Sequence, residues 1–262
     1  MELQRRYDDI KAQGLGLIAV SYDTPETLKT FADRRGITFP MVSDHRSVII
    51  KQYGLLNETM DPKTPYYGVP YPGTFLLDTN GVVTARYFED AYQERNTVAS
   101  ILARQGLTST GGIVSTSNTV HVAVSASVSD ADVAPGKRIS LVFDVAPKTN
   151  MHVYAPGKHA YQVIRVVLDP QPWLKVHATR YPASEVYELK ALNERVEVYS
   201  KPFRLVQDVT ILATGEAQRF LNGTPTVTLA GTLEYQACDD RVAYAREKLP
   251  VSFTLTVKGL DR

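Results

Sequence analysis

Cys238 is the only cysteine among the 262 residues of this chain, and its thiol is the side chain best suited to covalent chemistry. A thiolate can attack a disulfide, but a second thiol is needed to resolve the mixed disulfide that results. This chain can therefore form a mixed disulfide but cannot release it by itself. The carboxylates of Asp239 and Asp240 follow directly and are expected to raise the pKa of the thiol.

Two interpretations of Cys238 remain open from its surroundings. A buried single cysteine commonly packs as a small hydrophobic residue and is chemically inert. A reactive cysteine would instead exchange with a partner protein that carries a dithiol or a disulfide. The pair Asp239-Asp240 is likewise open to two uses, as paired carboxylates or as the polar residues of a β-turn, and the turn is the commoner use.

Other chemistry has little support in the sequence. His152, His159 and His177 are too dispersed to form a ligand set, and no second cysteine supports a zinc site. Asp44-His45 lacks a nucleophile on a strand–helix turn, so a hydrolase triad is not supported. We therefore expect no metal and no cofactor.

A second informative stretch is Val69-Pro70-Tyr71-Pro72-Gly73-Thr74-Phe75-Leu76-Leu77-Asp78, in which a proline-rich loop runs into an apolar strand. Asp78-Thr79-Asn80-Gly81 is a hairpin turn signal, and Val82 to Tyr87 is the second strand of the hairpin. Pro72 precedes a buried strand, where a cis peptide bond is plausible. An ordinary rigid loop is the alternative.

The elements around this stretch alternate between strands and helices. Thr24 suits a helix N-cap, Pro25 the first helical position and Gly36 the helix end. The alternation predicts an α/β layer with a mixed sheet. The expected elements are a helix over 2–13, strands over 15–21 and 39–42, and helices over 25–35, 45–53 and 96–105.

The run Pro72-Gly73-Thr74-Phe75-Leu76-Leu77-Asp78, followed by Asn80-Gly81-Val82-Val83, resembles the segment after the cis-proline in thioredoxin-like redoxins. These are the AhpC/TSA and TlpA-like proteins, and the resemblance covers about Glu2 to Gln105. It implies a thiol–disulfide oxidoreductase or a peroxiredoxin-like antioxidant protein. It also implies that Pro72, Gly73 and Thr74 line the substrate groove.

Two departures from that family pattern matter. The family carries its catalytic cysteine at a helix N-terminus, where the thiol pKa is lowered, but residues 1–237 contain no cysteine. The first strand and the start of that helix are also absent, so the strand over 15–21 should expose an unpaired, apolar edge. Peroxiredoxins usually place an arginine where this chain has Gly73. The order Pro-Gly-Thr-Phe therefore looks closer to the TlpA-like reductases than to peroxidases.

The second half of the chain has a different pattern. Residues 107–119 are rich in small and polar residues and predict a linker. Beyond them, short alternating strands separated by proline and glycine predict an all-β immunoglobulin-like sandwich. These strands are expected over 121–128, 138–145, 163–168, 195–199, 203–212, 226–236 and 249–257.

Tyr235-Gln236-Ala237-Cys238-Asp239-Asp240 resembles the redox motif of the DsbD N-terminal domain, an immunoglobulin-like module of a bacterial thiol:disulfide interchange protein. The segments 151–157 and 249–255 also fit, and the resemblance covers about Val120 to Gly259. It implies that Cys238 is the catalytic thiol. In this pattern Ala243 occupies the position of the second cysteine.

Composition excludes several other classes. The net charge is +1 with no basic run, which argues against nucleic-acid binding, and no apolar stretch is long enough to span a membrane. We expect an incomplete thioredoxin-like domain at 1–106, a linker at 107–119 and an immunoglobulin-like domain at 120–262. The resemblances suggest a periplasmic or extracytoplasmic redox protein. The alternative is a non-catalytic binding protein on a degenerate redox scaffold.

Overall fold

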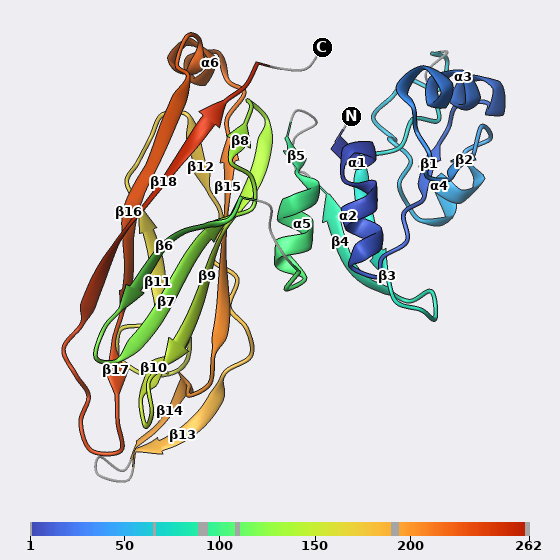
Figure 1. The fold of residues 1–262 in the computed structure, drawn as a ribbon. Coiled ribbons are helices and arrows are strands. Elements are labelled where there is room, and N and C mark those ends of the chain that lie inside the picture. Colours follow the sequence, from blue (N-terminus) through green and yellow to red (C-terminus); the bar gives the residue numbers. More distant parts are fainter. Residues whose placement is uncertain (1, 65–66, 89–93, 108–110, 190–193, 260–262) are drawn as a thin grey trace. The chain divides into compact units, whose positions relative to one another are not determined.

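The computed structural model describes residues 2–64, 67–88, 94–107, 111–189 and 194–259, and the chain divides into two compact units, 1–92 and 93–262 (Figure 1). The first unit mixes short helices and strands, and the second consists almost entirely of strands.

The first unit contains two separate two-stranded sheets. In one, β1 and β2 run parallel, with Val20 opposite Val42, and in the other β3 and β4 are antiparallel. Its elements are α1 (Glu2–Arg5), α2 (Tyr7–Ala12), β1 (Ala19–Ser21), α3 (Pro25–Arg35), β2 (Met41–Ser43), α4 (Val48–Gln52), β3 (Gly73–Leu77) and β4 (Val83–Phe88).

The predicted ends of the helix over 25–35 and the predicted turn at Asp78 are confirmed. Thr24 caps α3 by accepting a hydrogen bond from the Thr27 amide, and Gly36 ends the helix in the left-handed region. The Asp78 carboxylate accepts the amides of Asn80 and Val82, each at 2.9 Å, and so fixes the β3–β4 turn. The helix predicted over 2–13 is instead interrupted, because α1 ends at Arg5 and α2 begins at Tyr7.

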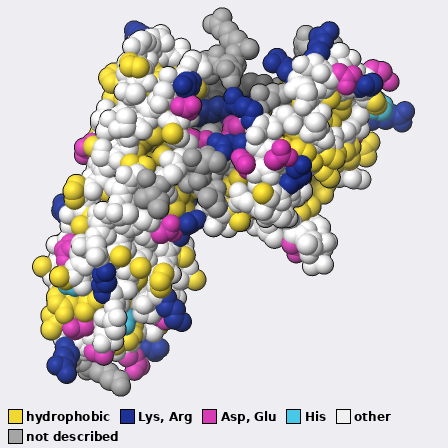
Figure 2. Space-filling model, viewed as in Figure 1, with side chains coloured by type: hydrophobic (Ala, Val, Ile, Leu, Met, Phe, Trp, Pro, Cys, Tyr) yellow, Lys and Arg dark blue, Asp and Glu magenta, His cyan; other side chains and the backbone are white. Residues whose placement is uncertain are grey.

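Apolar side chains remain uncovered around β1 and β2. Ile18, Val20 and Val42 are 63%, 46% and 38% exposed. Figure 2 shows hydrophobic side chains gathered on the visible face of this unit, over the region of β1, β2 and α4. Among the described strands, β1 pairs only with β2, and β3 pairs only with β4. The strand predicted over 15–21 is shorter in the structure, since β1 covers only Ala19–Ser21, and the predicted apolar edge is present there.

The second unit is built from three sheets. The largest has the order β12-β15-β9-β7-β6, and two four-stranded sheets have the orders β11-β16-β18-β8 and β13-β14-β10-β17. Its strands are β5 (Arg95–Asn96), β6 (Ile113–Asn118), β7 (Val122–Val128), β8 (Asp132–Val133), β9 (Lys137–Pro147), β10 (His152–Tyr154), β11 (Arg165–Leu168), β12 (Leu174–Val176), β13 (Glu185–Leu189), β14 (Glu194–Tyr199), β15 (Phe203–Ile211), β16 (Thr226–Tyr235), β17 (Ala237–Cys238) and β18 (Glu247–Val257), and its helices are α5 (Val98–Arg104) and α6 (Gly215–Leu221).

The core of the second unit lies between its sheets. Phe143 on β9 and Phe253 on β18 are both fully buried and meet edge to face, with ring centroids 5.9 Å apart. Inward residues alternate along β7, where Val122, Val124 and Ala126 are buried. The seven predicted strands of this half are confirmed, each within about two residues of its predicted ends. No helix in the described residues is long and apolar enough to cross a membrane.

The structure departs from the sequence prediction at the junction between the two halves. The helix predicted over 96–105 is present as α5, but it packs on β9 of the second unit. Within the predicted linker, Ile113–Asn118 forms β6, an edge strand that pairs with β7. A strand at a sheet edge is held mainly by backbone hydrogen bonds, so its polar sequence gives little sign of it. Residues 108–110 lie outside the described residues.

His177 makes the stability of the second unit depend on pH. Burial and the neighbouring charges of Arg138 and Lys175 lower its pKa to about 4, although Asp208 and Glu94 oppose this. Its Nδ1 accepts a hydrogen bond from Arg138 at 2.6 Å, so the ring is neutral. Between pH 6.5 and 4 the unfolded chain binds a proton that the folded chain does not, and stability therefore falls as the pH falls.

We expect the free energy of unfolding of this unit to fall by up to about 1.4 kcal/mol per pH unit between pH 6.5 and 4.5. The fall should be seen as a lower urea midpoint. In His177→Gln, this component of the pH dependence should disappear, because glutamine can accept from Arg138 without titrating. An unchanged pH profile in His177→Gln would contradict the assignment.

Candidate functional site

Cys238 lies in a small hairpin between β16 and β18. It pairs with Ala243 across an isolated antiparallel bridge, so these two residues are directly opposite each other. The Asp239 carboxylate holds the turn by accepting the amides of Arg241 at 2.8 Å and Val242 at 2.7 Å. The turn role of Asp239 is thus confirmed.

The base of this hairpin is closed by a cluster of polar side chains. Tyr235 and Glu247 form the last pair of the β16–β18 ladder, and the tyrosine hydroxyl donates to the carboxylate at 2.6 Å. The other Glu247 oxygen lies 2.6 Å from Nδ1 of His121, whose ring packs against Tyr244. Tyr244 in turn donates its hydroxyl proton to Asp239 at 2.7 Å. The hairpin is therefore tied to its base through side chains as well as backbone.

The Cys238 thiol is fully buried in a cluster separate from the main core. Tyr154 packs in the same cluster, and Tyr161 stacks on Tyr154 with ring centroids 4.2 Å apart. Tyr161 comes from the segment between β10 and β11 and donates its hydroxyl proton to Glu194 at 2.7 Å. The segment is also joined to the hairpin, because Gln236 accepts the Gln162 amide at 3.0 Å.

The thiol is protonated at neutral pH in this environment. Burial is the largest cause that raises the pKa of Cys238, and Asp239 and Asp240 raise it further. The neighbouring hydroxyl of Tyr154 acts in the opposite direction and lowers it. The predicted effect of the two aspartates is therefore present, but burial exceeds it. A protonated thiol is a weak nucleophile, so exchange requires that the site open or that a partner alter it.

Aromatic and histidine side chains surround the thiol in a way that the sequence did not predict. His152 is directly opposite Cys238 in the β10–β17 register, and its ring packs on Tyr187 at 4.1 Å. A hydrogen bond to Asp240, together with burial, raises the pKa of Tyr187 to about 12. No side-chain partner of ordinary geometry within the described residues satisfies Tyr154 Oη, His152 Nδ1 or His159 Nδ1. The segment 152–159, Tyr187 and the hairpin at 238–240 are far apart in sequence, so strand pairing and packing bring them together.

The described residues contain no group of three or more histidine, cysteine or acidic side chains placed to hold a metal ion. His152 and His159 lie near the thiol cluster, whereas His177 lies on the large sheet with Arg138 and Thr210. The three histidines therefore do not come together at one site.

Pro72, Gly73 and Thr74 lie in the first unit, at the entry to β3, and Cys238 lies in the second. All peptide bonds of the described residues are trans, so Pro72 belongs to an ordinary rigid loop. Gly73 is opposite Phe88, and a Cβ at position 73 would overlap the Phe88 ring. Phe88 also packs edge to face on Phe75, with centroids 5.2 Å apart. An aromatic ring therefore occupies the space beside Gly73.

The burial of Cys238 predicts slow alkylation. In the folded chain, iodoacetamide should modify it at least about a hundredfold more slowly than in the urea-unfolded chain, because reaction requires local opening. Tyr161→Ala removes the stacked ring and the bond to Glu194 and should raise the native rate about tenfold. Phe220→Ala, an exposed aromatic position on α6, is the control. Equal rates in Tyr161→Ala and the wild type would show that this segment does not limit access.

Comparison with known proteins identifies the first unit. Residues 1–86 match the AhpC/TSA family, so this region is a redoxin domain of the thioredoxin-like class. A putative peroxiredoxin of Mycobacterium tuberculosis is 35% identical over 80 residues, which are 30% of this chain and 50% of that protein. Peroxiredoxin Bcp of Escherichia coli is 28% identical over 81 residues, 31% of this chain and 51% of that protein.

The thiol-disulfide oxidoreductase ResA of Halalkalibacterium halodurans is 32% identical over 82 residues, 31% of this chain and 39% of that protein. The chain spans about half the length of the curated peroxiredoxins it matches. Among solved structures, the N-terminal periplasmic domain of ScsB from Proteus mirabilis is similar with a TM-score of 0.37 and 13% identity, covering 56% of this chain and 50% of that one.

Proposed function

We propose that this chain takes part in thiol–disulfide exchange, with the Cys238 hairpin as its exchange site. The observation that carries the proposal is the bridge that places position 243 directly opposite Cys238 in a hairpin fixed by Asp239 and Tyr244. This is the arrangement that a cross-strand cysteine pair requires. The redoxin match of residues 1–86 supports the same class of chemistry.

The reaction at this site is a single exchange. The Cys238 thiolate attacks one sulfur of a partner's disulfide and forms a new S–S bond, while the partner's other sulfur leaves as a thiolate and takes up a proton. Ala243 supplies no thiol to resolve the mixed disulfide, so a dithiol partner must do so. The second unit then acts as an immunoglobulin-like module of the DsbD N-terminal type, passing electrons to or from that partner.

The redoxin unit supports a reductase better than a peroxidase. Peroxidases of this class usually have an arginine at the position of Gly73, and the ring of Phe88 fills the space that such a side chain would enter. We propose that the redoxin unit is completed by a further strand that pairs between β1 and β3. The helix that follows this strand would carry the catalytic cysteine. The strand edges there and the exposed side chains of Ile18 and Val20 support this placement. Pro72, Gly73 and Thr74 would line the adjacent substrate groove.

A non-catalytic binding role is the second candidate, and three observations favour it. Cys238 is fully buried, its pKa is raised, and the residue opposite is Ala243. In that case the hairpin and the segment between β10 and β11 recognise a partner without covalent chemistry. For either role we propose a location outside the cytoplasm, on the resemblance of the second half to a bacterial thiol:disulfide interchange module.

A peptide carrying a 2-pyridyl disulfide tests the proposal in the folded full chain. The exchange role predicts release of one equivalent of pyridine-2-thione and a mass adduct on Cys238, more rapidly in Tyr161→Ala. Cys238→Ser is the negative control. If neither the wild type nor Tyr161→Ala forms the adduct while the unfolded chain does, the exchange proposal fails and the binding role leads.

A further inference from the structure

The outer face of the large sheet of the second unit carries a buried anion. Asp208 on β15 is on the side of the sheet that points away from the Phe143–Phe253 core, yet it is only 1% exposed. Its register partner Ser140 donates its hydroxyl proton to the carboxylate at 2.7 Å. An ionised carboxylate out of water requires a compensating cation, since its desolvation is costly.

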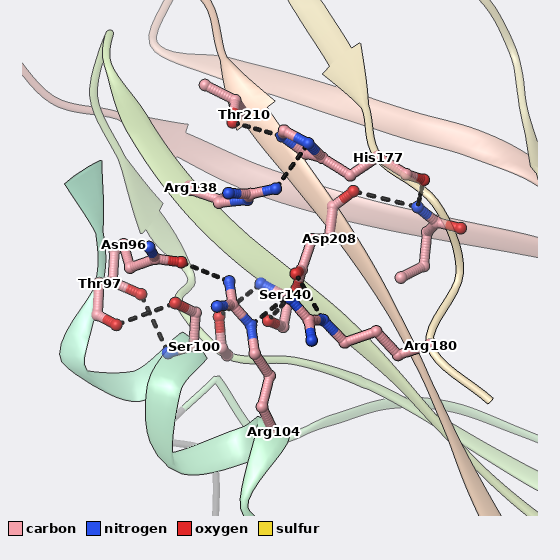
Figure 3. Close-up of polar contacts among 12 residues, drawn as sticks. Asn96, Thr97, Ser100, Arg104, Arg138, Ser140, His177, Arg180, Asp208 and Thr210 are labelled. Carbon is pink, nitrogen blue, oxygen red and sulfur yellow. Dashed lines mark hydrogen bonds and ion pairs between the residues drawn. The ribbon is translucent and has the colours of Figure 1, made fainter. Parts of the chain in front are cut away.

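Arg104, the last residue of α5, supplies that cation. Its Nε lies 3.1 Å from Asp208 Oδ1, and both side chains are almost completely buried, at 2% and 1% exposure. Arg180 approaches the other carboxylate oxygen at 3.3 Å but is 57% exposed at its side chain. Arg104 also donates to the Asn96 side chain, as Figure 3 shows. Of the two arginines that pair with Asp208, the buried one therefore comes from the helix α5.

The rest of the segment fits the same face. Thr97 caps α5 and also donates its hydroxyl proton to the buried Asp130 at 2.6 Å. Arg95 and Asn96 pair in parallel with β9, and Glu94 forms an ion pair with Lys175 at 3.1 Å. Most of α5 is buried, and its five buried residues are small or aliphatic: Ala99, Ser100, Ile101, Leu102 and Ala103.

We propose that residues 94–107 are an intrachain docking segment, and that the outer sheet face is an interaction surface for a helix that presents one arginine beside small residues. Asp208 is the specificity determinant of this surface, because a helix without a cation at the position of Arg104 leaves the buried carboxylate with only the largely exposed Arg180 as an ion-pair partner. Many helices could fit this face by shape and backbone pairing alone. The buried Asp208 carboxylate restricts binding to a helix with a cation at the position of Arg104. The proposal is independent of the thiol chemistry at Cys238.

Amide hydrogen exchange in the full chain tests this assignment. In Arg104→Ala, amides of 98–105 should exchange at least about tenfold faster, while amides of the β16–β18 ladder keep their wild-type protection. Arg195→Ala, at a 73% exposed side chain, is the matched control and should change neither region. Unchanged protection of α5 in Arg104→Ala, or an equal loss in α5 and in β16–β18, would overturn the proposal.

A paired variant keeps the test decisive if Arg104→Ala does not fold. Arg104→Met with Asp208→Asn removes both charges and should restore protection of α5 relative to either single change. A synthetic peptide of residues 94–107 gives a second readout. A buried, unpaired carboxylate in Ala103→Glu should displace the chain's own α5, because Ala103 is only 1% exposed. The peptide should then bind this variant, and an Arg104→Ala peptide should bind it at least about tenfold more weakly. Equal binding of the two peptides would show that the anion does not select the helix.

Discussion

Oxidation of an Ala243→Cys variant is expected to remove both thiols of the chain and to form one intrachain disulfide. Residues opposite each other on antiparallel strands have Cα atoms about 4.5–5.5 Å apart, which is within the range that disulfides span. Cys238 and Ala243 are such a pair, and the Asp239 turn holds them in register. The measurement is the loss of two hydrogens in the intact mass, with no thiol titratable after unfolding.

Val242→Cys is the matched control for this prediction. Val242 is adjacent in sequence but 51% exposed, and it is not the bridge partner of Cys238. It should keep two titratable thiols or form disulfides between chains. If Ala243→Cys also keeps both thiols, or links only to other chains, the hairpin does not hold the two positions as a cross-strand pair.

The new disulfide should also stabilise the second unit. It closes a loop of six residues, for which the chain-entropy relation gives about 2 kcal/mol of stabilisation. The effect should appear as a higher urea midpoint that returns to the wild-type value in dithiothreitol. A second thiol also allows a mixed disulfide to resolve within the chain, so the reduced variant should reduce one equivalent of a peptide disulfide to its dithiol and itself become the intrachain disulfide, whereas the wild type only captures the peptide.

Replacement of Gly231 by valine is expected to be the most damaging single change in the second unit. Gly231 on β16 is opposite Leu168 on β11, and a Cβ at 231 would lie 2.8 Å from Leu168 Cα and overlap the Val167 carbonyl oxygen. Both obstacles are backbone atoms, so they cannot rotate away as a side chain can. The strand β11 would have to separate from β16, and overpacking of this kind costs roughly 3 kcal/mol.

Urea unfolding of Gly231→Val and Gly231→Ala measures this cost, with Gly215→Ala as the control. Gly215 has no atom near its ideal Cβ and begins α6, so alanine there should change stability by less than about 0.5 kcal/mol. The loss in Gly231→Ala should be smaller than in the valine variant but in the same direction. Wild-type stability in both Gly231 variants would mean that β11 is not held as closely as the register indicates.

The elements that local chemistry specifies could be predicted from the sequence. Thr24, Pro25 and Gly36 mark the ends of α3, and Asp78 marks the β3–β4 turn, because each acts on amides within a few residues of itself. Alternation of apolar residues similarly indicates β7, where every second side chain is buried. In each case the signal and the structure it determines lie in the same short segment.

The allocation of α5 could not be predicted in this way. Its apolar residues suit either unit, and the choice depends on Arg104 meeting Asp208, a residue 104 positions away. At the site, the pairing of positions 238 and 243 follows the resemblance to the DsbD N-terminal module. The packing of Tyr154 and Tyr161 in the cluster around the thiol joins residues that are far from Cys238 in sequence. No pattern in the sequence predicts this packing.

The most direct test of the exchange role is the discharge of a mixed disulfide by a dithiol protein. The folded chain is first converted to its glutathione adduct at Cys238 and then mixed with reduced thioredoxin, and release of glutathione is followed by mass. The same adduct on Val242→Cys in a Cys238→Ser background is the reference. Although position 242 is the more exposed, we predict discharge from Cys238 at least about tenfold faster, because the exchange role requires a partner's dithiol to recognise the opened hairpin at Cys238 and not a sulfur beside it. Equal or slower discharge from Cys238 would contradict its role as the exchange site.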